Sequence, residues 1–330
     1  MKFSTQVTIP EPAFDISYHD KIMLIGSCFA ENMGHKLQEA KFTADVNPFG
    51  TLYNPLSVAL AVKTLLHPAP FSSGDLFEHE GLFHSFAHHS RFSSPAPDES
   101  CNRINRQLTA SAICLSKATR LLLTFGTAFV YRLKSNGQVV SNCHKLPEKM
   151  FCREMASADL IVREWNTALL SLWEQNPDIK ILFTVSPIRH WRDGAHTSQL
   201  SKATLLLSVD ALQKKYPERT GYFPAYEIMM DELRDYRFYA DDMLHPSPVA
   251  IAYLWECFAR RYLTGESQAV IKEWQEIQQA LHHKPFYPHS EGYRRFISQT
   301  LAKAEQMSRK FPYFDMANEI ELLKSNVNKI

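Results

Sequence analysis

Glycine is scarce in this chain, and the patterns that mark several common classes of protein are missing. Only 11 of the 330 residues are glycine, and no Walker or dinucleotide-binding fingerprint appears, so we expect no nucleotide or other cofactor. No apolar run approaches the ~18 residues of a membrane-spanning helix, and the first ten residues lack the apolar stretch of a signal peptide. We therefore expect a soluble, cytoplasmic protein with no membrane partner.

An excess of either charge is missing as well. Lys and Arg number 36 against 35 Asp and Glu, so electrostatics gives no reason to expect nucleic acid as a partner. The six cysteines include no C-x-x-C pair, and a chain of this length does not need disulfide bonds to be stable. We expect reduced thiols, no structural zinc site and a small-molecule substrate, while the composition leaves the oligomeric state open.

Short apolar runs predict three buried strands, at residues 21–25, 120–124 and 180–185. Each run is continuous rather than alternating, as is typical of strands buried on both faces of a parallel sheet. Alternation of these strands with helices predicts the α/β class, with a parallel sheet covered by helices. Helical patterns are present at residues 29–40, 56–66, 102–117, 158–174, 199–215 and 248–263.

The chain divides into a large domain and an extension. We expect the α/β domain over residues 1–263, with inserted hairpins at residues 76–92 and 129–140. Residues 264–330 are polar and charge-rich, and they predict a helical C-terminal extension. Its two helical patterns lie at residues 266–281 and 291–310.

Side chains suited to acyl transfer lie at two points of the chain. Ser27 and Cys28 follow the strand predicted at residues 21–25, where a helix is expected to begin. Asp242 and His245 precede another predicted helix. An Asp that orients a His, and a His that takes a proton from a hydroxyl or thiol, are two parts of a hydrolytic triad. Since ligands of open parallel sheets bind beyond the carboxyl ends of the strands, the nucleophile is expected at the ligand site.

The sequence leaves the nucleophile open. Cys28 at a helix start is chemically suitable, because the free N–H groups and the helix dipole favour a thiolate and lower its pKa. Ser27 is the second candidate, although it is also a good N-cap for the same helix. The remaining alternatives are an inert buried Cys28, and an Asp242 and His245 that only bond backbone groups before their helix.

The pentapeptide at residues 26–30 reads Gly-Ser-Cys-Phe-Ala, and four further segments accompany it, at residues 47–51, 124–128, 184–190 and 231–239. Together these segments resemble the GSCFA family, which is named for the pentapeptide, and through it the SGNH (GDSL-like) hydrolases. The resemblance covers most of the predicted α/β domain. It implies a three-layer α/β/α fold and hydrolysis of an ester or other acyl bond.

The resemblance also implies roles for single residues. The SGNH pattern places its nucleophile third in a Gly-Asp-Ser sequence, and counting from Gly26 puts Cys28 in that place. Ser27 matches the residue type but not this register. The Asp-x-x-His element of SGNH enzymes matches Asp242 and His245, with the His as base and the Asp as the residue that orients it.

Stabilisation of an oxyanion needs hydrogen-bond donors, commonly backbone N–H groups and an Asn side chain. The N–H of the nucleophile and that of Gly50 are candidates. The Gly-x-Asn element of the SGNH pattern corresponds here to Gly126, Thr127 and Ala128, so the expected Asn is replaced. Three side chains are candidates to substitute for it: Asn47, Asn54 and Thr127.

Two further residues are candidates for substrate contact. In a strand, His84 and His88 would share one face and His89 the other, so only two ligands align and we expect no metal. His84 is therefore expected in the wall of the active site or in a structural role. Arg189 follows the strand at residues 180–185 and is suited to bind a carboxylate or phosphate group, or else to pair with an acidic side chain.

These observations favour a hydrolase of an ester or acyl bond, for which the resemblance to SGNH enzymes suggests a carbohydrate O-acetyl ester. Two alternatives remain open at this point. One is an acyltransferase, which uses the same covalent step with an acceptor other than water. The other is a module that has lost catalysis and binds a glycan or acylated ligand without turnover, an alternative favoured by the Ala in place of Asn.

Overall fold

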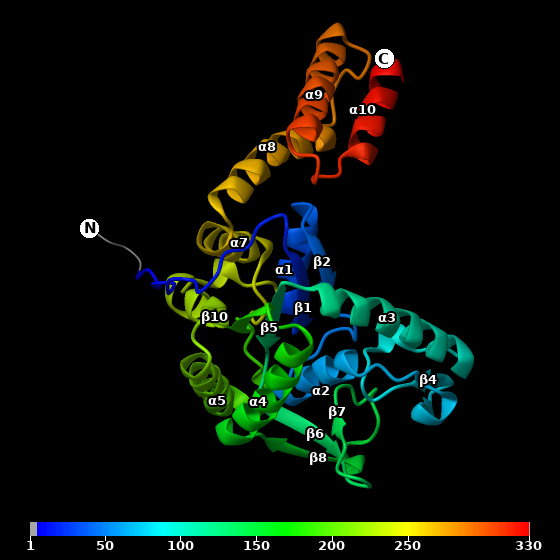
Figure 1. The fold of residues 1–330 in the computed structure, drawn as a ribbon, viewed down its shortest axis with the longest axis vertical. Helices are drawn as coiled ribbons and strands as arrows, with labels where there is room; N and C mark the ends of the chain where they lie inside the picture. The colour runs from blue at the N-terminus through cyan, green and yellow to red at the C-terminus, as the bar shows by residue number, and fades with distance from the viewer. Residues whose placement is uncertain (1–4, 330) are drawn as a thin grey trace.

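In the computed structural model, which describes residues 5–329, a five-stranded parallel sheet lies at the centre of the fold (Figure 1). Its strands are β1 (Lys21–Gly26), β2 (Thr43–Val46), β5 (Arg120–Phe125), β9 (Lys180–Val185) and β10 (Thr220–Phe223). They lie in the order β10-β9-β5-β1-β2. The strand order therefore reverses between β1 and β5, and ligands of open α/β sheets bind beyond the carboxyl ends of the strands at such a reversal.

Helices cover both faces of the sheet, which confirms the predicted three-layer α/β/α arrangement. Side chains alternate along the strands, so that Met23 and Ile25 pack into one core and Ile22 and Leu24 into the other. The first core is closed by α2 (Pro55–Leu66), α3 (Pro97–Lys117), α4 (Ala158–Gln175) and α5 (Gly194–Lys215). The second core is closed by α1 (Cys28–Glu39) and α7 (Pro248–Tyr262).

The three strands predicted from the sequence are β1, β5 and β9, which form the middle of the sheet. Nearly every residue of these strands is buried, as their continuous apolar runs indicated. The two outer strands were not predicted, because both are short and β2 has no fully buried residue. The six helices predicted in the α/β domain are present, although α3 begins at Pro97 rather than residue 102, since proline is accepted in a first helical turn.

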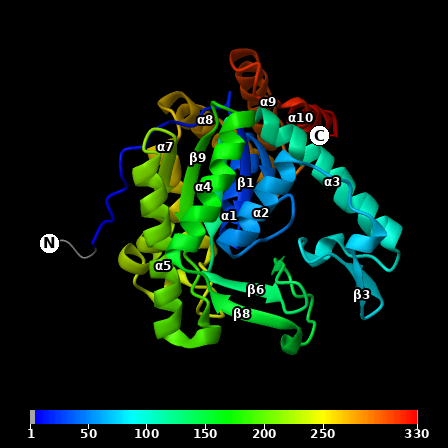
Figure 2. The same cartoon turned by 60° about the horizontal axis from the view of Figure 1, so that its bottom comes forward.

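Two smaller β-structures contain the predicted hairpins. β3 (Phe77–His79) pairs antiparallel with β4 (Leu82–His84), and β6 (Phe129–Leu133) pairs antiparallel with β7 (Val139–Val140). β6 also pairs with β8 (Phe151–Met155), which the sequence did not predict, and the small sheet has the order β7-β6-β8. Because β6 follows β5 after a short turn, this sheet lies beyond one end of the central strands (Figure 2).

Three helices form a separate layer at the C-terminal end of the chain (Figure 1). They are α8 (Gly265–His282), α9 (Glu291–Lys310) and α10 (Ala317–Lys329). The first two match the helices predicted at residues 266–281 and 291–310, and α10 was not predicted. These helices share a core of their own, separate from the two cores of the sheet.

The C-terminal helices contact the α/β domain near the end of α1. Nε1 of Trp274 donates a hydrogen bond to the carbonyl oxygen of Glu39 at 2.8 Å. Lys41 forms an ion pair with Glu319 at 2.7 Å. The extension is thus attached far from the carboxyl ends of the strands, where the candidate site lies.

The predicted division into residues 1–263 and 264–330 stays a prediction, and residues 1–4 and 330 lie outside the described residues. Among residues 5–329, no helix combines the length and the apolar character needed to cross a membrane. Short helical segments complete the structure: α6 (Ala225–Glu227), η1 (Ser73–Asp75), η2 (Ser90–Phe92), η3 (Glu148–Met150), η4 (Trp191–Asp193), the π-helical η5 (Ile228–Glu232) and η6 (Tyr236–Phe238).

Candidate active site

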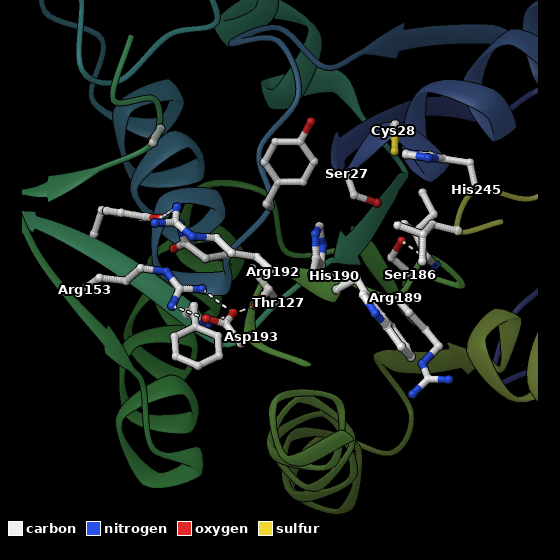
Figure 3. Close-up of a pocket in the computed structure, with 18 of the residues that line it drawn as sticks. Ser27, Cys28, Thr127, Arg153, Ser186, Arg189, His190, Arg192, Asp193 and His245 are labelled. Carbon is white, nitrogen blue, oxygen red and sulfur yellow. Dashed lines mark hydrogen bonds and ion pairs between the residues drawn. The ribbon is translucent and has the colours of Figure 1, made fainter. Parts of the chain in front are cut away.

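A cavity of about 370 Å³ opens at the carboxyl ends of β1, β5 and β9, beside the reversal in strand order (Figure 3). Ser27 follows β1, Thr127 follows β5 and Ser186 follows β9, and all three residues line the cavity. His245 comes from the segment before α7 and lines the same cavity, as does Phe129 of β6. The convergence expected at the carboxyl edge of the sheet is therefore present.

The turn after β1 is tight and fixes the position of Ser27. Gly26 has a φ of +152°, and a Cβ there would lie 2.2 Å from the carbonyl oxygen of Thr124, so only glycine fits against β5. Ser27 then caps α1, because its Oγ accepts a hydrogen bond from the backbone N–H of Phe29 at 3.3 Å. The residue is only 1% exposed. The hydroxyl of Ser27 is thus used to hold the start of the helix.

Cys28 is the first residue of α1 and lines the cavity. Burial raises the pKa of its thiol, and this effect outweighs the backbone N–H groups of Cys28 and Phe29 and the charge of Lys202, which favour the thiolate. The helix start acts in the direction expected from the sequence, but the net lowering of the pKa predicted there is wrong. A thiol with a raised pKa is protonated at neutral pH and needs a base to act as a nucleophile.

Asp242 and His245 are bonded to each other. Nδ1 of His245 lies 2.5 Å from Oδ2 of Asp242, and Oδ1 accepts the backbone N–H groups of Leu244 and His245 at 2.9 Å each. The backbone N–H groups first, and then the ring, lower the pKa of the Asp242 carboxyl to about 2. The ionised carboxylate holds the proton on Nδ1, which leaves Nε2 as the proton acceptor. Figure 3 shows the ring of His245 and the sulfur of Cys28 pointing toward one another.

Lys202 is a charged residue beneath this site that the motifs of the sequence did not reveal. It is 2% exposed, and its Nζ donates hydrogen bonds to the carbonyl oxygens of Gly126 at 2.7 Å and Ser186 at 2.8 Å. Burial lowers the pKa of its ammonium to about 7, and the nearby Cys28 opposes this shift. The one signal in the sequence is spacing, since position 202 falls on the buried stripe of α5.

His190 also lines the cavity, and its Nε2 is buried with no hydrogen-bond partner among the described residues. Burial is the main cause that lowers the pKa of its ring to about 4, and the charges of Lys202 and His245 add to this effect. The ring is therefore neutral at pH 7. A buried ring nitrogen without a partner in a cavity wall is available to hydrogen-bond a ligand.

The loop after β5 uses its N–H groups within the fold. The backbone N–H groups of Gly126 and Thr127 both donate to the carbonyl oxygen of Tyr53, at 2.7 and 3.0 Å. Ala128 is fully buried, and its N–H donates to Oγ of Ser201 at 2.8 Å. The hydroxyl of Thr127 lies 3.1 Å from the same Oγ, although the residue lines the cavity. None of these three backbone N–H groups is therefore free to act as an oxyanion donor.

Asn54 borders the cavity, whereas Asn47 and Gly50 do not. The N–H of Gly50 donates to the carbonyl oxygen of Asn47 at 2.7 Å, and Oδ1 of Asn47 accepts the N–H of Gly26 at 2.9 Å. These bonds hold the loop after β2, so the oxyanion and substrate roles predicted for Gly50 and Asn47 are corrected. Asn54 caps α2 with Oδ1, and its Nδ2 donates one hydrogen to Ser57 at 2.9 Å, which leaves a second N–H.

His84 lies in the hairpin β3-β4 and does not border the cavity. Its Nδ1 lies 2.7 Å from Oγ of Ser93, and its Nε2 lies 3.2 Å from the carbonyl oxygen of His79. Both ring nitrogens are used within the fold, so a role in the active-site wall is wrong and the structural alternative holds. Across residues 5–329, no group of three or more His, Cys, Asp or Glu side chains is arranged to hold a metal ion.

Arg189 lines the cavity, and its guanidinium lies 4.9 Å from the centre of the Trp191 ring. Its Nε is buried without a hydrogen-bond partner, and the structure shows no ion pair between this arginine and any described acidic residue. Arg153 and Arg192 line the same cavity, but each pairs with an acidic side chain. The sequence left open whether Arg189 binds a ligand or pairs with an acidic side chain, and the structure leaves this arginine available to a ligand.

Comparison with known families gives two matches. A model of the GSCFA family matches residues 21–258, and a model described as the C-terminal domain of GSCFA domain proteins matches residues 274–329. Cys28 and His245 both fall within the first match. No curated protein matches the chain.

Proposed function

The chain belongs to the GSCFA family, and we propose that it hydrolyses an ester or other acyl bond at the cavity described above. The observation that carries the proposal is that the Cys28 thiol and the imidazole of His245 line one cavity and point toward one another, with Asp242 bonded to the other side of the ring. A nucleophile, a base and an orienting carboxylate are the parts that covalent acyl transfer requires. The Asp-x-x-His spacing and a nucleophile directly after the first strand support a relation to the SGNH hydrolases.

Cys28 is the nucleophile in this proposal. Ser27 is almost fully buried, and its Oγ already accepts the N–H of Phe29. Cys28 is half-buried, lines the cavity and faces His245 (Figure 3). Its raised thiol pKa makes a neighbouring base necessary, and His245 supplies one.

The reaction proceeds in two acyl-transfer steps. Nε2 of His245 accepts the thiol proton of Cys28 while the sulfur attacks the acyl carbon. The tetrahedral intermediate collapses to a thioester on Cys28, and the leaving alcohol takes the proton from His245. Water then attacks the thioester and gives a proton to His245, which returns it to the sulfur as the carboxylic acid leaves. Through both steps, Asp242 keeps Nδ1 protonated and stabilises the imidazolium.

Three groups support stabilisation of the negative charge on the acyl oxygen. The N–H of Cys28 belongs to the first turn of α1, where N–H groups have no partner within the helix. The second N–H on Nδ2 of Asn54 takes the part that the SGNH pattern gives to a different Asn. The buried ammonium of Lys202 adds positive charge from below. A single oxyanion donor is worth about 10²–10³ in kcat.

The lining of the cavity supports a carbohydrate ester as the substrate class. Tyr53, Phe129, Tyr131 and Trp191 all border the cavity. Aromatic faces stack on the apolar faces of sugar rings, while the unpartnered Nε2 of His190 offers a hydrogen bond to a hydroxyl. If the acceptor is a second sugar rather than water, the same steps make the protein an acyltransferase.

A binding module without catalysis is the competing function. It is favoured by Ala128, which stands where an SGNH enzyme has its oxyanion Asn and is fully buried with its N–H bonded to Ser201. A binding module keeps the cavity and its aromatic lining but has no use for the His245–Asp242 pair. Turnover that depends on His245 therefore distinguishes the two functions.

Hydrolysis of p-nitrophenyl acetate and of acetylated sugars by the purified protein tests the proposal. We expect turnover above the buffer rate and a loss of at least about 10²-fold in both Cys28→Ala and His245→Ala. Ser27→Ala is the matched control at the neighbouring position, and it should lose only the helix cap, worth about 1 kcal/mol of stability. Circular dichroism and thermal melts confirm that all variants are folded.

The outcomes separate the alternatives. Turnover lost in Ser27→Ala but kept in Cys28→Ala would move the nucleophile to Ser27. Turnover unchanged in His245→Ala would refute covalent acyl transfer. Mass spectrometry of acid-quenched wild-type protein should locate the acyl group on Cys28. Binding of acetylated sugars without any turnover would support the binding module.

A further inference from the structure

A second cavity, of about 490 Å³, adjoins the candidate active site. The two cavities share Arg189, Trp191 and Leu244 in their walls. Tyr236 and Tyr239 line the second cavity only. A ligand longer than the first cavity therefore continues into the second past these shared residues.

The segment that carries the proposed base separates the two cavities. His245 borders the first cavity, Asp242 and Met243 border the second, and Leu244 borders both. Backbone hydrogen bonds hold this segment in place, from Ala240 N–H to the oxygen of His245 and from Met243 N–H to that of Ala240, each at 2.8 Å. A bond cleaved beside His245 therefore lies at the junction of the two cavities.

A positive charge without an acidic partner lies at the same junction. Arg189 forms no ion pair with a described residue, and its buried Nε has no hydrogen-bond partner. Arg234, in the wall of the second cavity, is instead bound to Asp231 at 3.0 Å. An unpaired guanidinium in a cavity wall binds a carboxylate or phosphate through two parallel hydrogen bonds.

Aromatic side chains in the walls are left exposed. Trp191, at the junction, is 50% exposed, and Tyr236, in the second cavity, is 72% exposed. Large apolar surfaces that a folded protein leaves uncovered inside a cleft are typical of ligand contacts. Sugar rings present flat faces of C–H groups, and aromatic rings stack against such faces while the hydroxyl groups stay in water.

We propose that the two cavities form one cleft that binds an anionic oligosaccharide, with its negative group on Arg189 and successive sugar rings on Trp191 and Tyr236. The position of a cleaved acyl group on this ligand, beside Cys28, rests on the proposed function. Binding of the oligosaccharide does not depend on it, because the charge and the aromatic rings lie outside the nucleophile and its base.

An acidic peptide is the other ligand with this charge. Extended peptides are recognised mainly through rows of free backbone donors and acceptors. The wall between the cavities offers few, because the backbone groups of Ala240, Met243 and His245 already bond one another, and Ser247 N–H donates to the oxygen of Phe238 at 2.8 Å. The observations thus favour a glycan over a peptide.

Isothermal titration calorimetry with unesterified glycans tests this inference on the wild-type protein, since such glycans cannot be hydrolysed at an ester. The probes are tetragalacturonate, monogalacturonate and the neutral galactotetraose. We expect tetragalacturonate to bind at least about tenfold more tightly than either of the others. Arg189→Gln should remove the preference for charge, and Tyr236→Ala the preference for length. Arg106→Gln, an exposed arginine of α3 outside both cavities, is the matched control.

Equal affinity for the tetramer and the monomer would refute the single cleft, and equal affinity for the charged and neutral tetramers would refute the role of Arg189. Tighter binding of tetraglutamate than of tetragalacturonate would assign the cleft to an acidic peptide instead. A protein that binds the tetramer but hydrolyses no ester would retain this inference and lose the proposed function, so the two failures are distinguishable.

Discussion

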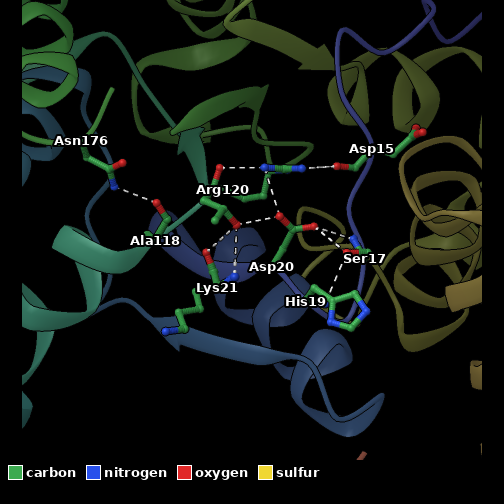
Figure 4. Close-up of polar contacts among 9 residues, drawn as sticks. Asp15, Ser17, His19, Asp20, Lys21, Ala118, Arg120 and Asn176 are labelled. Carbon is green, nitrogen blue, oxygen red and sulfur yellow. Dashed lines mark hydrogen bonds and ion pairs between the residues drawn. The ribbon is translucent and has the colours of Figure 1, made fainter. Parts of the chain in front are cut away.

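The amino and carboxyl edges of the central sheet differ in how fully their buried polar side chains are hydrogen-bonded. At the amino ends, Asp20 accepts hydrogen bonds from Ser17, through its N–H at 2.7 Å and its hydroxyl at 3.0 Å, and from the Thr119 hydroxyl at 2.6 Å (Figure 4). Arg120 pairs with Asp20 at 3.1 Å and donates two more hydrogen bonds to the carbonyl oxygen of Asp15. The charges of Asp20 and Arg120 are thus each matched by several partners.

At the carboxyl ends, some buried polar side chains have nitrogen atoms without a hydrogen-bond partner among the described residues. Nε2 of His190 and Nε of Arg189 are buried with none among the described residues. The ammonium of Lys202 donates to two carbonyl oxygens but has no acidic partner among the described residues. Buried polar groups without partners cost stability, and a ligand bound in this cavity would supply partners for the His190 and Arg189 atoms. The amino edge therefore matches its buried charges within the fold, whereas the carboxyl edge leaves polar groups available to a ligand.

Asp242→Asn should give the largest effect and should leave stability nearly unchanged. The carboxamide no longer holds the proton on Nδ1 of His245, so the ring loses the orientation and tautomer that a base requires. We expect kcat for ester hydrolysis to fall by about 10²–10⁴-fold with a thermal melt close to that of the wild type. Steady-state kinetics and differential scanning calorimetry measure both. A large loss of stability with normal kcat would mean that Asp242 supports the fold rather than the reaction.

Asp20→Ala should show the opposite pattern. Asp20 is 8% exposed, and its removal leaves Arg120 without its acidic partner and the Thr119 hydroxyl without its 2.6 Å acceptor. We expect the free energy of unfolding to fall by about 2–4 kcal/mol, with kcat per folded molecule unchanged. Urea denaturation at pH 7 measures the loss. Asp178→Ala, an exposed Asp before β9 at the same edge, is the control and should change stability by less than about 0.5 kcal/mol.

Lys202→Met tests whether the charge of Lys202 lowers the pKa of the Cys28 thiol. Methionine fills a similar volume but removes the charge that favours the Cys28 thiolate. The pKa of the thiol should rise further, and the rate of its alkylation by iodoacetamide at pH 6, where Lys202 carries its charge, should fall by about tenfold. Mass spectrometry follows the modification of Cys28 over a range of pH. An unchanged pH profile would mean that Lys202 only joins the ends of β5 and β9, through Gly126 and Ser186.

The sequence predicted the part of the fold that depends on local pattern. β1, β5 and β9 are buried on both faces, so their apolar runs identified them, whereas the half-buried β2 carries no such signal. The same holds for the site. Cys28, Asp242 and His245 stand in short motifs. The structure brings Cys28 and His245 to one cavity and bonds Asp242 to the His245 ring, while their catalytic roles stay predictions. Lys202 was missed because its carbonyl partners come from two strands distant from it in the chain.

Tertiary contacts also explain why three residues were wrongly predicted to lie in the site. Gly50, Asn47 and His84 were assigned to the site because they stand in family segments or in a run of histidines. Their hydrogen bonds hold the surrounding backbone instead, as from Gly50 to Asn47, from Gly26 to Asn47 and between His84 and Ser93. Sequence position cannot distinguish a residue that shapes a loop from one that reaches the cavity, because the difference lies in tertiary contacts.

A smaller effect should appear at the carboxyl edge when the pH is lowered. Burial holds the pKa of His190 near 4, below the ~6.5 of an unfolded histidine, so the unfolded chain binds a proton that the folded chain refuses. Stability from this group is fully present above pH 6.5 and is lost as the pH falls toward 4. His190→Gln should reduce the loss between pH 7 and pH 5 by on the order of 1 kcal/mol. Lys202, His245 and Arg153 face the ring and oppose its charge, while Asp193 favours it.

Urea denaturation at both pH values provides the comparison. The exposed His196, changed to Gln, should leave the pH dependence as in the wild type. Equal slopes for the wild type and His190→Gln would mean that His190 takes up its proton in the folded protein at its ordinary pKa.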